Sequence, residues 1–454
     1  MRESMSPAIA ASAPGSSATS TAAPACRRAA ASARRCVPRQ STATGPRPTT
    51  TARSRRSPSQ NASATGSRCA RPGGATSASQ LAHWSASRST SSTSWDSTST
   101  VYAGARPRCM VDAMVRVAVI GAGAWGINHV RTFARLRECE LVLVCERDEA
   151  RRRRAAAIAP GARLGARLSD ALEADDVDAV VLATPAAHHA DHARAALRAG
   201  KHVLVEKPLA LRVADAEAVI AAAARAGRTL MVGHLMLYHP AFLRLVDVVR
   251  AGDLGRVLYA YAVRVNLGRL RRDENALWSL GPHDVSMLLY ALGAVPESVS
   301  ARGGCYLQPG VEDVVFVNLR FPGGTVAQIH LSWLDPRKER RLTVVGDRKM
   351  IELDDTHPTE KLRIHDKGYD VPPAFTEYDQ FLQIRHGDTL IPRVDMVEPL
   401  ELECRHFVEC VATGATPRSD GRTAVNVVRV LEAAQESLAG DGAPVTIRPE
   451  ADHA

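Results

Sequence analysis

From Val115 onward, short apolar runs alternate with segments whose apolar residues recur at helical spacing. The runs have the length and composition of buried strands, and each is followed by a stretch long enough for a crossover helix. Such alternation predicts a parallel sheet covered by helices on both faces, with right-handed connections. The expected strands are 115–120, 140–145, 179–183, 202–205 and 229–233, and the expected helices are 128–136, 151–157, 189–199 and 213–226.

The pattern changes after about residue 241. Longer, partly alternating segments follow, and turn signals such as Pro322-Gly323-Gly324 separate several of them. This predicts a second, α+β domain with a large, mostly antiparallel sheet. The expected strands are 257–266, 298–303, 311–321, 325–334 and 341–354, and the expected helices are 283–292, 398–413 and 424–438. The polar stretch 368–397 is expected to be an irregular surface excursion.

The first quarter of the chain has a different composition. Residues 1–113 contain no lysine, 15 arginines and three acids, and Ala, Ser, Thr and Pro dominate the rest. A segment with so few large apolar side chains cannot offset its chain entropy, so we expect a disordered tail. A GC-rich upstream region translated from too early a start would also look like this, and Met114 is then the natural start. The expected domains are therefore 1–113 (tail), 114–240 (dinucleotide-binding), 241–440 (substrate-binding) and 441–454 (C-terminal tail).

The charge of the chain follows the same boundary. Removing the tail's 15 arginines and three acids from totals of 58 basic and 48 acidic residues changes the net charge from +10 to −2. The tail has no basic block longer than two residues, so we expect neither nucleic acid nor membrane as a partner. The sequence shows no apolar run of about 20 residues, no secretory signal and no Cys-x-x-Cys. We expect a cytoplasmic protein with reduced cysteines and no metal site.

A glycine motif follows the first predicted strand. Gly121, Gly123 and Gly126 form Gly-x-Gly-x-x-Gly, with Ala124 and Trp125 between the last two. The strand before, the helix after and the acid Glu146 at the end of the second strand are the context of a dinucleotide site. The diphosphate would lie at the helix N-terminus. Glu146 favours NAD over NADP, whereas the neighbouring Arg147 could pair with a 2′-phosphate. A Rossmann fold for another nucleotide, or for none, stays open.

Three further segments follow in order: Ala183-Thr-Pro-Ala-Ala-His-His189, Ala199-Gly-Lys-His-Val-Leu-Val-Glu-Lys-Pro208 and Met231-Val-Gly-His234. Together with the glycine motif, they resemble the Gfo/Idh/MocA family of oxidoreductases over residues 115–440. The stretch Asn266–Asp284 looks like the branch near the sugar-nucleotide 3-dehydrogenases, which oxidise C3 of a UDP-linked N-acetylhexosamine or its uronic acid.

The resemblance implies roles for residues of the first domain. Thr184 and Pro185 would lie beside the nicotinamide half of NAD, and His189 and Glu206 would line the same cleft. Lys207 would lie beside the reacting carbon, where a lysine of lowered pKa can take the hydroxyl proton while hydride leaves to the nicotinamide. A structural ion pair between Lys207 and an acid is the alternative.

His283 resembles the family's active-site histidine at the start of a helix, and a histidine suits proton exchange near neutral pH. The family's commonest pattern has aspartates four residues before and three after this histidine. Here those positions are Ser279 and Ser286, and Asp284 follows directly instead. The proton partner of His283 is therefore open, and a helix-start residue without chemistry is the alternative reading.

The substrate-contacting candidates are Asp284 and the arginine cluster Arg269, Arg271 and Arg272, which could clamp a diphosphate. An ordinary solvated surface is the alternative for the arginines. The sequence thus predicts an NAD-dependent dehydrogenase of a sugar or UDP-sugar. A dehydrogenase of a free sugar or cyclitol, and a catalytically silent NAD-binding protein, remain as alternatives. The open sheet of the second domain needs covering, which predicts a homodimer or homotetramer.

Overall fold

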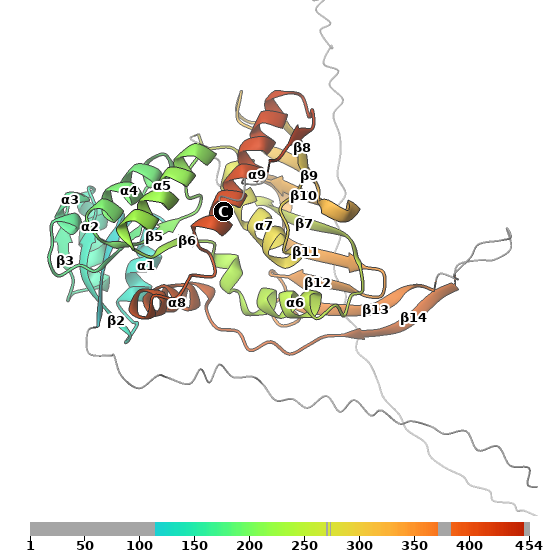
Figure 1. The fold of residues 1–454 in the computed structure, drawn as a ribbon, viewed down its shortest axis with the longest axis horizontal. Coiled ribbons are helices and arrows are strands. Elements are labelled where there is room, and N and C mark those ends of the chain that lie inside the picture. Colours follow the sequence, from blue (N-terminus) through green and yellow to red (C-terminus); the bar gives the residue numbers. More distant parts are fainter. Residues whose placement is uncertain (1–113, 269–270, 273, 371–382, 449–454) are drawn as a thin grey trace, which may run out of the picture. The chain divides into compact units, whose positions relative to one another are not determined.

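The computed structural model describes residues 114–268, 271–272, 274–370 and 383–448. The predicted tail 1–113 and Arg269 lie outside these residues. The described chain forms two sheets and the helices around them (Figure 1).

The first sheet has six parallel strands in the order β3-β2-β1-β4-β5-β6. Val117 and Val119 of β1 face the apolar cluster that includes α1 and α2, and Ala118 and Ile120 face the cluster that includes α4 and α5. Burial on both faces explains why these strands are continuous apolar runs. The predicted doubly wound sheet is confirmed. Its strands are β1 Val115–Ile120, β2 Cys139–Cys145, β3 Arg163–Gly165, β4 Ala179–Leu182, β5 His202–Glu206 and β6 Leu230–Gly233.

The helices of this domain are α1 Gly126–Phe133, α2 Glu149–Ile158, α3 Ser169–Leu172, α4 His189–Arg198 and α5 Val213–Ala226. The short η2 (Leu235–Tyr238) and α6 (Pro240–Arg250) lead into the second domain.

The second sheet has nine strands in the order β14-β13-β12-β11-β7-β10-β9-β8-β15. All neighbours are antiparallel except β7 and β10, which run parallel. The predicted mostly antiparallel sheet is confirmed. Its strands are β7 Val257–Leu267, β8 Ser298–Gly304, β9 Val314–Arg320, β10 Val326–Ser332, β11 Leu334–Gly346, β12 Met350–Asp354, β13 Leu362–Asp370, β14 Gln383–Leu390 and β15 Val445–Thr446.

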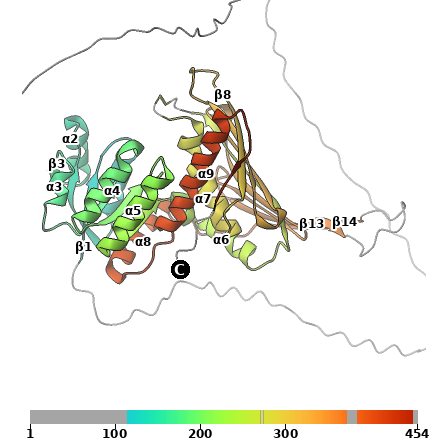
Figure 2. The same cartoon turned by 45° about the horizontal axis from the view of Figure 1, so that its top comes forward.

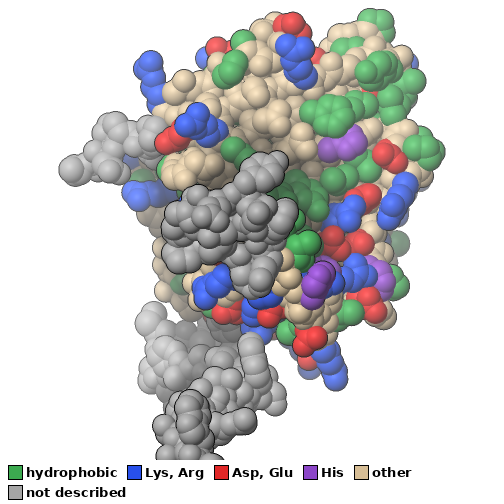
Figure 3. Space-filling view, turned by 90° about the vertical axis from the view of Figure 1, so that its right-hand side faces the viewer, with side chains coloured by type: hydrophobic (Ala, Val, Ile, Leu, Met, Phe, Trp, Pro, Cys, Tyr) green, Lys and Arg blue, Asp and Glu red, His purple; other side chains and the backbone are tan. Residues whose placement is uncertain are grey.

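Helices α6, α7 (Ala276–Leu292) and α9 (Gly421–Ala439) lie on one face of this sheet, and no described helix lies on the other (Figure 2). The bare face carries Tyr259 of β7, Phe316 of β9 and Val326 of β10, each more than a third exposed. Figure 3 views the molecule from this side, and hydrophobic side chains stand there among charged ones. The sheet therefore has one buried face and one apolar face open to solvent.

The chain returns to the first domain near its end. Helix α8 (Pro399–Thr413) packs against α1 and η2, and an isolated bridge joins Met231 at β6 to Asp420. Residues far apart in sequence therefore lie behind the glycine turn.

The expected helix start at His283 was wrong. Helix α7 begins at Ala276, where the Asn275 side chain accepts a hydrogen bond from the Trp278 amide, and His283 lies in its middle. Pro282 is inside the helix. A proline there cannot donate to the carbonyl four residues earlier, so Pro282 suggested a helix start although it only disturbs one turn.

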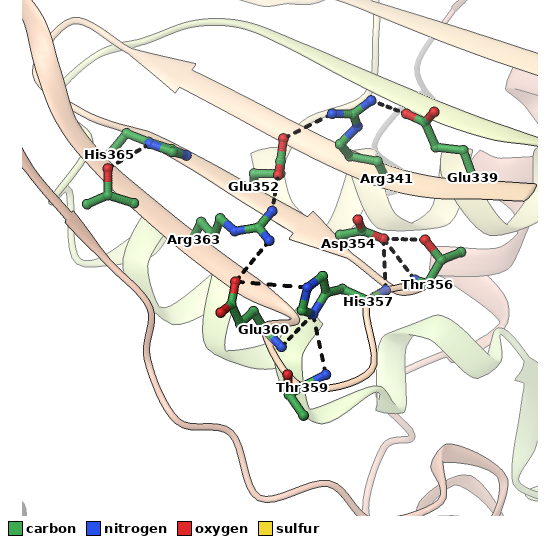
Figure 4. A network of polar contacts seen from close by, with 11 residues as sticks. Glu339, Arg341, Glu352, Asp354, Thr356, His357, Thr359, Glu360, Arg363 and His365 are labelled. Atoms are coloured by element: carbon green, nitrogen blue, oxygen red, sulfur yellow. Dashed lines mark hydrogen bonds and ion pairs between the residues drawn. The ribbon is translucent and has the colours of Figure 1, made fainter. Parts of the chain in front are cut away.

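The expected irregular stretch 368–397 was also wrong in part, because β13 and β14 form an antiparallel pair at the sheet edge. The predicted strand 341–354 is two strands, β11 and β12, with a turn after Gly346. Ion pairs link β11, β12 and β13. Arg341 and Arg363 both donate hydrogen bonds to Glu352, and Arg363 also donates to Glu360 (Figure 4). Cross-strand charge pairs stabilise a polar edge that hydrophobic periodicity does not reveal.

The glycine turn between β1 and α1 is packed against its own backbone. A Cβ on Gly126 would lie 2.1 Å from the Gly121 carbonyl oxygen and 3.0 Å from the Ala183 Cβ. Gly121 has a φ of +94° and lies against the Ala183 carbonyl. Larger residues cannot occupy these two positions without moving the turn away from β4.

We expect Gly126→Ala to lower the free energy of unfolding by about 1–3 kcal/mol, the usual cost of overpacking. Gly161→Ala is the matched control, since nothing lies within 4 Å of its Cβ position. Urea unfolding of both variants measures the difference. Equal stability of the two would show that the turn is not tightly packed.

Candidate functional site

The glycine turn and Glu146 form the first part of the site. Glu146 follows β2 and accepts hydrogen bonds from the backbone N–H groups of Ala122 (2.7 Å) and Asp148 (3.0 Å). The N–H groups of Gly123, Ala124 and Trp125 donate to no described residue. Free N–H groups at a helix N-terminus are a site for an anion such as a diphosphate. The free N–H groups of the turn therefore fit the diphosphate of a dinucleotide.

Two arginines flank this turn. Arg147 is exposed beside Glu146, at the same edge of the sheet. The Arg151 guanidinium comes within 3.7 Å of the Cβ position of Gly123 and was not identified from the sequence. A run of arginines on α2 gave no sign of which one faces the turn.

Thr184 and Pro185 follow β4, as expected, and His189 begins α4. The His189 ring is buried between two backbone carbonyls, 2.7 Å from that of Pro208 and 2.7 Å from that of Thr184. A neutral ring donates to one of them and a charged ring to both. The structure therefore places His189 as a link between the β4 and β5 loops.

Glu206 ends β5 and faces α1. Its Oε1 accepts from Trp125 Nε1 and from His129 Nε2 (2.6 Å), and its Oε2 accepts from the Lys207 backbone N–H (3.2 Å). Burial acts against the charged form, but the hydrogen bonds from His129 and Trp125 outweigh it and hold the pKa of Glu206 below its ordinary value. Glu206 thus joins the glycine turn to the lysine loop.

Lys207 lies between the domains and precedes a cis bond to Pro208. Its Nζ donates to the Ser279 carbonyl of α7 at 3.0 Å. Burial lowers the pKa of the Lys207 ammonium, and the charges of Glu274 and Glu206 oppose this only in part. The structure therefore brings the predicted lysine to the second domain, as an amine that gives up its proton more readily than an exposed one.

His283 is on the same helix, and its Nδ1 is buried without a partner among the described residues. Burial, followed by the charges of Arg264 and Lys207, holds the pKa of His283 well below its ordinary value. Burial and the Arg264 charge therefore favour a neutral ring near neutral pH, whereas the sequence suggested an imidazole that exchanges protons there.

His234 follows β6 and was not selected from the sequence. It is 1% exposed, and neither ring nitrogen has a partner among the described residues. Burial lowers its pKa to about 4, and it interacts electrostatically with Glu206, Lys207 and His283. Three unpartnered imidazole nitrogens therefore lie near the Lys207 amine, at a place where a polyhydroxylated ligand or water would satisfy them.

Asp284 lies in a buried ion pair. Arg264 donates to both carboxylate oxygens, at 2.6 and 3.1 Å, and both side chains are almost fully buried. Arg264 follows Ala260 and Ala262 at inward positions of the alternating strand β7. A charged residue at an inward position needs a buried partner, and this was the missed signal.

The arginine cluster is only partly described. Arg271 pairs with Glu274 at 2.6 Å, and the charges of both residues act on Lys207. Arg272 is exposed.

Among the described residues, no group of three or more His, Cys, Asp and Glu could hold a metal ion, and no described helix is long and apolar enough to cross a membrane.

Comparison with known proteins supports one family for both domains. The family described as "Oxidoreductase family, NAD-binding Rossmann fold" matches residues 115–234, and the GFO/IDH/MocA C-terminal domain matches residues 242–352. A protein of solved structure from Magnetospirillum magnetotacticum MS-1 is 33% identical, with a TM-score of 0.60; the match covers 71% of this chain and 99% of that one.

Two further relatives are enzymes or cofactor complexes. The 4-carboxy-2-hydroxymuconate-6-semialdehyde dehydrogenase of Sphingobium sp. is 28% identical, over 72% of this chain and all of its own. GenD2 from gentamicin A biosynthesis, solved in complex with NAD, is 28% identical with a TM-score of 0.63, over 75% of this chain and 99% of its own. This chain therefore belongs to the Gfo/Idh/MocA family of oxidoreductases, whose first domain is an NAD-binding Rossmann fold.

Proposed function

We propose that this chain oxidises a ring hydroxyl of a sugar or sugar nucleotide, with NAD as the hydride acceptor and Lys207 as the base. The observation that carries the proposal is the position of the half-buried Lys207 side chain. It lies at the carboxyl edge of the first sheet, where ligands bind in open α/β folds, and it reaches the second domain through the Ser279 carbonyl. Bound NAD would supply the hydride acceptor at C4 of its nicotinamide ring.

The cofactor would be held by residues from both ends of the glycine turn. Gly121, Gly123, Ala124, Trp125 and Gly126 form the diphosphate site, with Glu146 at the adenosine ribose. Arg147 lies beside it. Thr184, Pro185, His189, Glu206 and Lys207 shape the nicotinamide end, His189 and Glu206 through the contacts described above. The free N–H groups of the turn support this assignment.

Lys207 and His283 would share the proton chemistry. A neutral Lys207 amine accepts the proton of the substrate hydroxyl as hydride leaves the same carbon. The unpartnered Nδ1 of His283 supplies a second acceptor, or holds the substrate hydroxyl in place. Removal of the proton and of hydride from one carbinol leaves a carbonyl group.

The substrate is proposed as a UDP-N-acetylhexosamine oxidised at C3, with Arg271 and Arg272, and Arg269 outside the described residues, as clamps for the diphosphate. Arg271 already pairs with Glu274 near Lys207, so a bound diphosphate would compete with that carboxylate for the guanidinium. Asp284 would act behind the site through Arg264. The second candidate is a free sugar or cyclitol. Reduction of NAD with UDP-N-acetylglucosamine, myo-inositol or glucose separates the two. No turnover with any sugar would favour a silent NAD-binding protein.

Covering of the bare sheet face would make the protein a homodimer or homotetramer. Beside Tyr259 and Tyr261, this face has a hollow of about 450 Å³. Apolar faces of this kind are usually covered by a second subunit. A cytoplasmic location stays a prediction from the sequence.

Lys207→Ala should lower turnover by about 10²–10⁴-fold, the usual contribution of general acid–base groups. The dissociation constant of NAD should change little, because the diphosphate and ribose contacts lie elsewhere. His283→Ala should fall in the same range, and the double variant should be less than additive. Steady-state rates and NAD titration measure both. Near-normal turnover of Lys207→Ala would make Glu-Lys-Pro a structural signature here.

The pH profile gives a further check on the same residues. Because the pKa of Lys207 is lowered by burial, the base should become active below the ordinary range of lysine and be lost as pH falls through its pKa. His283 stays neutral, so His283→Ala should lower the rate without removing a limb near neutral pH. Loss of a neutral limb in His283→Ala would contradict this assignment.

NAD should bind more tightly than NADP, because the Glu146 carboxylate repels a 2′-phosphate. Glu146→Ala should narrow that difference in fluorescence titrations with the two reduced cofactors. A preference of the unchanged protein for NADP would show that Arg147 determines cofactor choice.

Tyr259→Lys should convert the proposed oligomer to a monomer, since it places a charge on the bare apolar face. Leu211→Lys is the control, because Leu211 is a similarly exposed apolar residue of the first domain (41% against 44%). Light scattering after size exclusion gives the mass of both. If the unchanged protein is itself a monomer, the proposed homodimer or homotetramer is wrong.

A further inference from the structure

Helix α8 brings two side chains from near the chain's end to the back of the candidate site. The Cys404 Sγ lies 3.7 Å from His129 Nδ1, and His129 Nε2 lies 2.6 Å from Glu206. Glu403, the residue before Cys404, is fully buried beside them. We call this group the Glu206 cluster; its members are Trp125, His129, Glu206, Glu403 and Cys404.

Glu403 has no partner among the described residues. Both of its carboxyl oxygens are buried, and neither has a hydrogen bond. An isolated, ionised carboxylate inside a protein is strongly unfavourable, and such a group becomes protonated instead. Burial raises the pKa of Glu403 well above its ordinary value, and the charge of Glu206 adds to this. Nothing in the sequence distinguished this glutamate from the other acids of its helix.

Glu206 and Glu403 differ in their donors. Glu206 accepts from the Trp125 indole, the His129 ring and the Lys207 backbone N–H. Glu403 accepts from none. Two carboxyl groups that interact in one buried site do not both ionise, and the proton stays on the one with fewer donors. Glu206 is therefore the charged member and Glu403 the neutral one.

The groups facing Glu403 come from several elements. They are Glu206 of β5, Tyr238 of η2 and its own neighbour Cys404, which in turn contacts His129 of α1. Burial raises the pKa of Tyr238 and of Cys404, so both keep their protons. The Tyr238 hydroxyl is already paired with Ser419 at 2.9 Å. Glu206 is thus the charged acceptor towards which a protonated Glu403 would donate.

We propose that Glu403 holds a proton at neutral pH and donates a hydrogen bond to Glu206, directly or through one buried water, and that it thereby positions Lys207. This role rests on the proposed function of Lys207. The Glu206 carboxylate binds the Lys207 peptide and lies close enough for its charge to act on the amine. A second negative charge would favour the protonated lysine, which cannot accept the substrate's proton. A neutral Glu403 keeps a single charge there and holds it in place.

Infrared spectroscopy tests the protonation without any enzyme assay. At pH 7, the unchanged protein should show the C=O stretch of a protonated carboxylic acid, and Glu403→Gln should remove that band. Glu409→Gln is the matched control, since Glu409 is on the same helix and exposed. If Glu403→Gln does not fold, loss of the same band in Glu403→Leu assigns the band to Glu403. Absence of a band that depends on Glu403 would overturn the proposal.

The pH dependence of turnover gives a second test, because the two protonation states predict opposite signs. If Glu403 is neutral, Glu403→Leu removes a donor and leaves more charge on Glu206, so the acidic limb of kcat/KM shifts to higher pH. If Glu403 is ionised, the same change removes a negative charge and the limb shifts to lower pH. We expect a shift to higher pH of up to about one unit, with about a tenfold loss of turnover, the scale of one hydrogen bond to a charged group.

Glu403→Gln should restore most of the turnover and the position of the limb, since the amide is a neutral donor of similar shape. A limb that moves to lower pH in both variants would overturn the proposal.

The two proposals fail separately. If Lys207→Ala retains turnover while the infrared band depends on Glu403, the protonation stands and the role of Lys207 does not. If the band is absent while Lys207→Ala is inactive, only the role of Glu403 fails.

Discussion

Partial burial of the Lys207 side chain between two domains is the constraint on which the other features of the site depend. An ammonium removed from water needs either nearby negative charge or a lowered pKa. The chain supplies some of each. The charges of Glu274 and Glu206 raise the pKa of the amine, whereas burial lowers it. The Ser279 carbonyl accepts a hydrogen bond from the amine and fixes its position. The two domains must therefore pack correctly before the lysine has its chemistry, which makes the domain contact part of the site.

The glycine turn and Glu146 could be predicted from the sequence because they depend on contacts between residues that are close together in the chain. Gly121 and Gly126 are needed where backbones touch, and Glu146 follows its strand at a fixed spacing. These features come from a strand, a turn and a helix that are continuous in sequence. The parallel and the mostly antiparallel character of the two sheets followed from the same cause, since strand periodicity reports which faces are buried.

The missing parts depend on contacts between distant segments. Glu403 is about 200 residues from Glu206, and its neighbours along α8 gave no sign that it would be unpartnered. Pro282 suggested that a helix starts at His283, but the helix starts seven residues earlier, at Ala276, where Asn275 is the N-cap. The polar strands β13 and β14 carry cross-strand charge pairs, which hydrophobic periodicity does not detect. Arg264 alone had a visible signal, as a charge at an inward position of an alternating strand.

The Arg264–Asp284 pair accounts for the departure from the family's commonest pattern around His283. With serines at 279 and 286, the charges that act most on the imidazole are that of Arg264 and, when it is protonated, that of Lys207, and both lower the pKa of the ring. Asp284 is occupied by Arg264. Burial lowers the pKa of both Lys207 and His283, and the proposed reaction would use both as acceptors of the proton taken from substrate. The charge then created lies next to Glu206 and Glu274, the two carboxylates that act on Lys207. In this arrangement the two acids favour the charged lysine, and burial favours the neutral amine.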